Sequence, residues 1–281
     1  MQTLNVLKLR TKRGFILNAF SEDSITKEVQ RKGEYDSNTL NSLSDILAVI
    51  KPEASLDVGA NIGNHVLVIA KFSQYVVAFE PVKFIFDVLK KNVEANSLDN
   101  VTPVNLGLSD KDSEVEIFIP QNGNLGSSSI EAKGGEGALL QINTIVGDTY
   151  LEENFKDQHV DFIKMDVEGH EAFALIGLQA VIAKYQPLIL LEWKSPNTIQ
   201  TFRELDLFNK LFPEYKKYSL SYTTNKKVHA NSTAGFLRRI YHKLIGSKWC
   251  LSRFDDTKYY TNVYFVPLRY QKFFNNFNYI D

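Results

Sequence analysis

The most constraining feature of the sequence is an alternation of short apolar runs with amphipathic runs between Ala54 and Trp193. The apolar runs predict buried strands, and the stretches between several of them place apolar residues at helical spacing. Strands that alternate with helices form parallel sheets with helices on both faces. The sequence therefore predicts a Rossmann-like α/β fold, with strands expected at residues 55–58, 75–79, 101–106, 114–119, 160–165 and 188–191.

The segments that flank this region predict further elements. Residues 4–20 alternate around Gly14, which is typical of a β-hairpin, and a helix with one apolar face follows and is stopped by Pro52. We therefore expect an N-terminal hairpin and helix addition at residues 1–53 and a main domain at 54–281. The main domain continues with helices expected at 169–184 and 198–211, strands at 218–222 and 260–266, and an insertion at about 226–258 that the sequence does not place.

The amino-acid composition limits the kinds of binding partner that we expect for the chain. The formal net charge is −1, so no global field attracts nucleic acid, and no run of about 18 apolar residues predicts a membrane span. Residues from Lys226 onward carry ten Lys or Arg against three Asp. This is either a solvated basic face or a surface that attracts an anionic substrate. The single cysteine, Cys250, and a start that does not look like a secretory leader lead us to expect a cytoplasmic protein.

A glycine-containing loop follows the first strand of the main domain. It reads Leu56-Asp57-Val58-Gly59-Ala60-Asn61-Ile62-Gly63. Gly59 and Gly63 allow a tight turn close to a ligand, and the next helix is expected to offer free backbone amides to an anionic or polar group. A dinucleotide site has a further glycine where Asn61 stands. The loop therefore favours a ligand without a pyrophosphate, such as one with an aminocarboxylate tail.

Glu80 ends the second strand, 21 residues after Gly59, and Pro81 follows it. In nucleoside-binding α/β folds, an acidic residue at this strand end accepts hydrogen bonds from the ribose hydroxyls. A carboxylate can accept two donors at once, which orients the sugar. Together with the glycine loop, Glu80 predicts a nucleoside site.

A cluster of acidic residues follows the fourth parallel strand. Asp166, Glu168, His170 and Glu171 stand in one short run, and Glu192 ends the next strand. Ligands in open α/β sheets bind beyond the carboxyl ends of the strands. The acids are candidates for a general base, or for ligands of a divalent cation held by Asp166 and Glu192. Alternatively, Glu168 and Glu171 favour the helix dipole and His170 is a packing residue.

These motifs together resemble the FkbM family of methyltransferases, over a stretch from about Ile25 to Trp193. The segments that carry the resemblance are Asp57–Gly63, Phe79-Glu80-Pro81 and Ile163–Glu171, with further support from Gly33–Asp36, Asn124–Ser129 and Pro187–Glu192.

The resemblance implies a class I methyltransferase fold, with a seven-stranded, mostly parallel sheet that ends in an antiparallel hairpin. It also implies S-adenosylmethionine as methyl donor. By position, Gly59, Ala60, Asn61 and Gly63 would line the methionine end of the donor, Glu80 would hold its ribose, and Asn105 to Ser109, including Leu108, would lie by the adenine. Asp57, Pro81 and Asp166 complete the expected cofactor set, and Asp166, Glu168, His170 and Glu192 the expected catalytic set.

The expected reaction is O-methylation of a sugar, a glycan or another small-molecule hydroxyl, with a divalent cation as an open possibility and no nucleic acid as partner. Three alternatives remain: an NAD-dependent oxidoreductase on a similar fold, a nucleic-acid methyltransferase, and a non-catalytic module that binds the donor. The G-x-x-x-G spacing opposes the first, and only the basic C-terminal segment favours the second.

Overall fold

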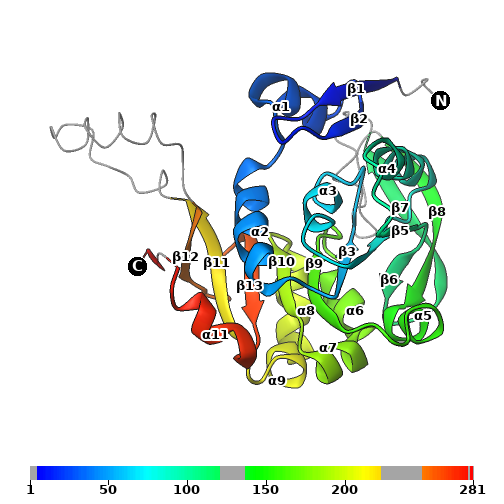
Figure 1. Ribbon diagram of the computed structural model, residues 1–281. Helices are drawn as coiled ribbons and strands as arrows, with labels where there is room; N and C mark the ends of the chain where they lie inside the picture. The colour runs from blue at the N-terminus through cyan, green and yellow to red at the C-terminus, as the bar shows by residue number, and fades with distance from the viewer. Residues whose placement is uncertain (1–4, 121–136, 223–248, 278, 281) are drawn as a thin grey trace, which may run out of the picture.

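Figure 1 shows the computed structural model, which describes residues 5–120, 137–222, 249–277 and 279–280. The stretch 124–129 and most of the expected insertion lie outside these ranges. Within them, no helix combines the length and the apolar character that crossing a bilayer requires.

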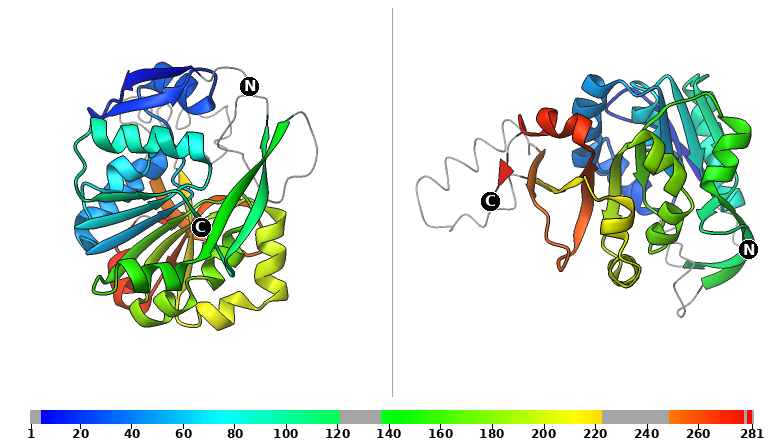
Figure 2. Two further views of the ribbon diagram at one scale, coloured as in Figure 1. Left: turned by 90° about the vertical axis from the view of Figure 1, so that its right-hand side faces the viewer. Right: turned by 90° about the horizontal axis from the view of Figure 1, so that it is seen from below.

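The central sheet has nine strands in the described part of the chain (Figures 1 and 2). Five of them, at one side of the sheet, are mutually parallel, and β13 runs antiparallel between β10 and β11. In spatial order the strands are β14 (Tyr279–Ile280), β12 (Trp249–Arg253), β11 (Lys216–Tyr222), β13 (Tyr260–Val266), β10 (Leu188–Trp193), β9 (Val160–Met165), β3 (Ala54–Val58), β4 (Tyr75–Phe79) and β5 (Val101–Val104).

The expected α/β class and its antiparallel final hairpin are confirmed, but the expected count of seven strands is too low. The seven strands from β11 to β5 form the predicted sheet, and β12 and β14 extend its edge. Strand β12 lies inside the expected insertion and pairs with β11 from Tyr218↔Arg253 to Tyr222↔Trp249. This pairing depends on a partner strand far away in the sequence, which a local pattern does not reveal.

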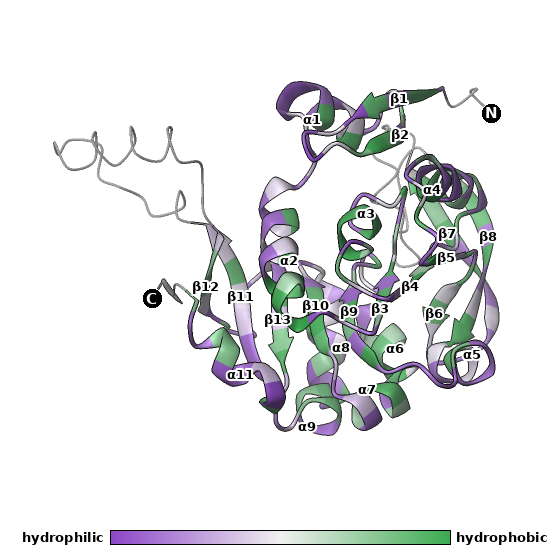
Figure 3. Cartoon of the chain, in the orientation of Figure 1, coloured by the Kyte–Doolittle hydropathy of each residue, from purple (hydrophilic) through white to green (hydrophobic). Residues whose placement is uncertain are grey.

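The side chains of the central strands contribute to two hydrophobic cores, one on each face of the sheet. In β10, Leu188 and Leu190 face one core while Ile189 and Leu191 face the other, as the two-residue period of a strand requires. Figure 3 shows hydrophobic residues concentrated in β13, α3 and α6, which lie within these layers. The first core is covered by four helices: α2 (Ser37–Ile50), α3 (Val66–Ile69), α4 (Lys83–Ala95) and α11 (Leu268–Phe274). The second core is covered by α5 (Gly147–Asn154), α6 (Glu171–Ile176), α7 (Gln179–Tyr185), α8 (Pro196–Glu204) and α9 (Leu207–Leu211).

Two helices that the sequence predicted as continuous are each divided in two. The helix expected at 169–184 is α6 and α7, which meet at Gly177. A Cβ at Gly177 would lie 2.0 Å from the backbone oxygen of Ser109, so the chain approaches a neighbouring strand closely at this break. The helix expected at 198–211 is α8 and α9, separated near Asp206, whose φ is 53°.

A second sheet stands beside the main one and carries a long hairpin. Its order is β6 (Gly107–Ser109), β8 (Gly137–Val146) and β7 (Ser113–Pro120). The strand expected at 101–106 ends at Val104, and β6 begins after a short break. The hairpin of β7 and β8 projects from the molecule in Figure 2.

The N-terminal hairpin, β1 (Val6–Arg10) with β2 (Ile16–Phe20), is confirmed and is followed by α1 (Ser24–Lys32). Asn92 of α4, which is fully buried, joins this hairpin to the glycine loop. Its Oδ1 accepts from the backbone of Asn18 at 2.6 Å, and its Nδ2 donates to the oxygens of Asn18 at 2.9 Å and Ile62 at 2.7 Å. One amide therefore satisfies the backbone of two separate segments.

We expect Asn92→Ala to lower the free energy of unfolding by about 2–4 kcal/mol, because each buried polar group left unsatisfied costs about 1–3 kcal/mol. Urea denaturation measures this change. Asn209→Ala is the matched control, since the Asn209 side chain donates to Asp206 on the surface, and it should change stability by less than about 0.5 kcal/mol. Equal effects of the two substitutions would contradict this role of Asn92.

Candidate active site

The glycine loop between β3 and α3 passes directly over the end of β9. Gly59 has a φ of 78°, and a Cβ there would lie 1.9 Å from the backbone oxygen of Asp166. Gly63 has a φ of 92°, and its Cβ would lie 2.7 Å from Leu89. Both positions therefore require glycine, as expected.

The backbone amides of this loop are used within the protein. Gly59 and Ala60 donate to the oxygen of Phe79, and Gly63 donates to the oxygen of Ala60. Asn61 N–H donates to Glu80 Oε2 at 3.0 Å, and Ile62 N–H donates to Asn61 Oδ1 at 2.7 Å. These five amides therefore already have acceptors within the protein.

Glu80 lies beside the loop in a fixed orientation and is only 6% exposed. Besides Asn61, it accepts from the backbone N–H of Val82 at 2.9 Å. Burial raises the pKa of Glu80 to about 7, although these two hydrogen bonds oppose the shift. Asn105 does not line the cavity described below; its Nδ2 donates to the oxygens of Glu80 and Pro81, both at 2.9 Å, and so holds their backbone.

Lys164 lies beneath the loop, and the sequence reasoning assigned it no role. Its Nζ lies 3.3 Å from Asp57 Oδ1 and from the oxygen of Gly59, and 3.7 Å from Asp166 Oδ2. Burial alone would lower the pKa of Lys164, but Asp57 and Asp166 raise it above its ordinary value. A lysine near the end of a buried, apolar strand was the available signal. Asp57 is fully buried here, so its contact is with the lysine and not with the cavity.

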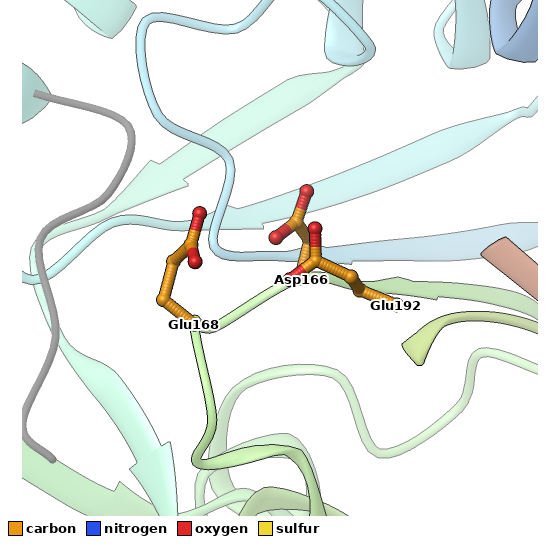
Figure 4. A group of neighbouring side chains, drawn as sticks. All are labelled: Asp166, Glu168 and Glu192. Atoms are coloured by element: carbon orange, nitrogen blue, oxygen red, sulfur yellow. The ribbon is translucent and has the colours of Figure 1, made fainter. Parts of the chain in front are cut away.

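Three carboxylates gather at the ends of β9 and β10 (Figure 4). Asp166, Glu168 and Glu192 each offer an oxygen, and these oxygens lie within 4.8 Å of one another. Burial and the charges of Asp166 and Glu168 raise the pKa of Glu192. The pKa of Asp166 is lowered: burial would raise it, but Lys164 and Lys194 outweigh that effect. The site therefore keeps Asp166 ionised beside a less acidic partner.

Lys194, which was not predicted from the sequence, offsets the negative charge of these carboxyl groups. Its Nζ lies 2.6 Å from Glu192 Oε1 and 3.2 Å from Glu168 Oε1. A divalent cation bound by the three carboxylates would have to displace this ammonium group. The donor set, with a lysine already among its oxygens, does not fit a metal ion, and we assign no step to one.

His170 is directed away from the acids and toward the second sheet. Its Nε2 lies 2.9 Å from Ser109 Oγ, and its ring packs against Phe173. It is not one of the residues whose potential ligand atoms lie within 4.8 Å of one another, which are Asp166, Glu168 and Glu192. Glu171 is buried and accepts from the backbone N–H groups of Val167 and Gly169, both at 3.1 Å, so it stabilises the turn before α6.

One cavity of about 510 Å³ joins most of these groups. Of the residues expected from the sequence, it is lined by Gly59, Ala60, Asn61, Glu80, Pro81, Leu108, Asp166, Glu168, His170 and Glu192. The other expected residues, Asp57, Gly63, Asn105 and Ser109, are not among those that line it. The sequence reasoning had not assigned Tyr35, Asp36, Asn64, His65, Lys164 and Lys194, which also line the cavity.

The strand order, the loop over β9 and the cavity at the carboxyl ends of the strands define an open α/β sheet with a ligand site at its strand ends. The model of the methyltransferase FkbM domain matches residues 57–220, more than half of the 281 residues. The chain belongs to the FkbM family of methyltransferases. A search among curated proteins found no match.

Three solved structures illustrate what the fold is similar to. The FkbM methyltransferase from Methylobacillus flagellatus KT has 18% identity and a TM-score of 0.44, over 76% of this chain and 44% of that one. This chain therefore spans less than half the length of that protein. The O-methyltransferase from Bacillus cereus in complex with SAH has 15% identity over 72% and 84% of the chains, with a TM-score of 0.45. An rRNA methylase from Streptococcus thermophilus has 9% identity over 82% and 94%, with a TM-score of 0.41.

We expect Gly59→Ala to prevent stable folding or to cost more than about 4 kcal/mol, because the new methyl group would overlap the Asp166 carbonyl. Gly14→Ala is the matched control. Gly14 has a similar φ of 87° but no atom within 4 Å of its Cβ position, so only the backbone strain of about 1–2 kcal/mol applies. Thermal or urea unfolding compares the two, and a similar cost for both would mean that the contact over β9 is not tight.

Proposed function

We propose that the cavity binds S-adenosylmethionine and transfers its methyl group to a hydroxyl oxygen of a sugar, a glycan or another small molecule. The observation that carries this proposal is the arrangement of Glu80 against the glycine loop at one wall of the cavity, with the carboxyl groups of Asp166, Glu168 and Glu192 at another. Both walls are formed at the carboxyl ends of β3, β4, β9 and β10, where ligands bind in open α/β sheets.

The residues of the first wall fit a nucleoside with a short polar tail. Each Glu80 oxygen accepts one backbone amide and keeps a lone pair for a ribose hydroxyl. Gly107 and Leu108 of β6 also line the cavity and suit the face of an adenine ring. Asn61 stands where a dinucleotide site needs glycine, which opposes NAD as ligand.

The negative charge of the site supports a positively charged methyl donor. The bound donor supplies an electrophilic methyl group on a positively charged sulfur. Asp166 stays ionised at the end of β9, so the protein presents negative charge toward this part of the cavity. Lys194 and Lys164 hold the acids in place and limit their mutual repulsion. Positioning of this kind supplies much of the acceleration of a displacement reaction.

Glu168 is the best candidate for the group that takes the proton from the acceptor hydroxyl. Burial and the neighbouring Asp166 raise its pKa, which makes it a stronger base than an ordinary carboxylate. His170 was an equal candidate from the sequence, but its Nε2 contact with Ser109 favours a role in supporting β6. Asp166, with its lowered pKa, is the weaker base and suits an electrostatic role.

The cofactor is tested by calorimetric titration of S-adenosylhomocysteine, the demethylated product of the donor. We expect a micromolar Kd, about −8 kcal/mol, for the wild type, and at least about tenfold weaker binding for Glu80→Ala. Glu94→Ala, an exposed position on α4, should bind as the wild type does. Binding of NAD in place of S-adenosylhomocysteine, or no binding at all, would overturn the proposal.

The raised pKa of Glu80 predicts a pH dependence of this binding. The ionised carboxylate accepts stronger hydrogen bonds than the protonated form, and its pKa is about 7, so affinity should rise several-fold between about pH 6 and 8. Glu80→Gln has no such titration, and its affinity should change less over the same range. Parallel pH profiles for the two proteins would contradict this assignment.

A further inference from the structure

An aspartate–histidine pair lines the cavity beside the glycine loop and has no part in the function proposed above. His65 comes two residues after Gly63, and its Nε2 lies 3.2 Å from Asp36 Oδ2. Asp36 belongs to the segment between α1 and α2, and its φ of 50° is left-handed. The pair therefore brings the N-terminal region to the edge of the loop.

The contact with Asp36 fixes how the ring is presented. An ionised carboxylate only accepts hydrogen bonds, so Nε2 carries the hydrogen and donates it. His65 precedes the first turn of α3, but its side chain makes no capping hydrogen bond there. In the described ranges, Nδ1 has no hydrogen-bond partner, and the ring can direct this second nitrogen to a ligand.

The backbone amides of the glycine loop are not available to bind the polar tail of a ligand. All five amides from Gly59 to Gly63 donate to acceptors inside the protein. A ligand with a charged aminocarboxylate tail needs hydrogen-bonding groups from somewhere else, because burying a charge without them is costly. His65 is the ionisable side chain nearest to the end of this loop in sequence, and it also lines the cavity.

Several carboxylates lie near His65 at the loop end of the cavity. A positive charge on the ring would lower the pKa of both Asp57 and Asp166, which lie under and beside Gly59. Of these carboxylates, Asp36 contacts the ring directly, and Asp166 lines the same cavity.

We propose that His65, held by Asp36, binds the aminocarboxylate tail of the donor; this inference rests on the proposed use of S-adenosylmethionine. The N-terminal segment thereby completes the donor site. With a proton on Nδ1 the ring donates to the carboxylate of the tail, and without it the ring accepts from the ammonium group.

Calorimetry with two ligands tests this proposal. S-Adenosylhomocysteine has the tail, and 5′-methylthioadenosine lacks it. We expect His65→Ala to bind S-adenosylhomocysteine about 10- to 100-fold more weakly, the effect of losing a hydrogen bond to a charged group, and to bind 5′-methylthioadenosine within about twofold of the wild type. Asp36→Asn should show the same selectivity with a smaller loss, because the ring remains but is less firmly held.

His159→Ala is the matched control. His159 Nδ1 also contacts an aspartate, Asp161, at 3.1 Å, but this pair does not line the cavity. The affinities of both ligands should stay unchanged in this variant. If His65→Ala does not fold, as judged by its thermal melt, His65→Gln replaces it in the comparison.

Decarboxylated S-adenosylhomocysteine identifies the group that is bound. Loss of the His65→Ala effect with this ligand assigns the contact to the carboxylate, and an undiminished effect assigns it to the ammonium group. Equal weakening of S-adenosylhomocysteine and 5′-methylthioadenosine, or no weakening of either, would overturn this inference alone. Failure of the wild type to bind both ligands would overturn the proposed function, and this inference with it.

Discussion

The arrangement of the site depends on the ammonium group of Lys164. It lies among Asp57 of β3, the carbonyl of Gly59 and Asp166 after β9, and so connects the ends of two neighbouring strands to the loop above them. Asp57 is fully buried, and burial raises its pKa while the charge of Lys164 opposes this shift. The same lysine helps to keep Asp166 charged in the cavity. One buried ammonium group thus contacts the loop and acts to lower the pKa of two carboxyl groups of the site.

The N-terminal region is connected to this arrangement from two sides. Asn92 bonds the hairpin at Asn18 and the loop at Ile62, and Asp36 contacts His65 just beyond the loop. Tyr35, next to Asp36, also lines the cavity, and burial together with the charge of Asp36 raises its pKa to about 12. Residues before β3 therefore form part of the cavity wall, and a division of the chain at residue 53 would cut through the site.

The sequence predicted those features whose signal is local. Glycines that need positive φ, an acid at a strand end and apolar runs are visible in a few consecutive residues, and Gly59, Glu80 and β9 were predicted correctly as structure. Features that depend on distant partners were missed. Strand β12 forms because β11 offers a free edge, and Lys194 matters because β9 and β10 bring Glu168 and Glu192 to it. His170 was grouped with the acids by sequence proximity, whereas a turn at Glu168, with a φ of 53°, and Gly169 directs it toward Ser109.

Lys194 also explains how three carboxylates can share one small space. Their mutual repulsion would otherwise favour uptake of protons or of a divalent cation. The lysine contacts two of them, and the raised pKa of Glu192 shows that one acid remains easier to protonate than the others. Asp166 keeps its charge because two lysines stabilise it. Negative charge is thereby concentrated on the acid that the glycine loop passes over, which is the place where a cationic donor would gain most from it.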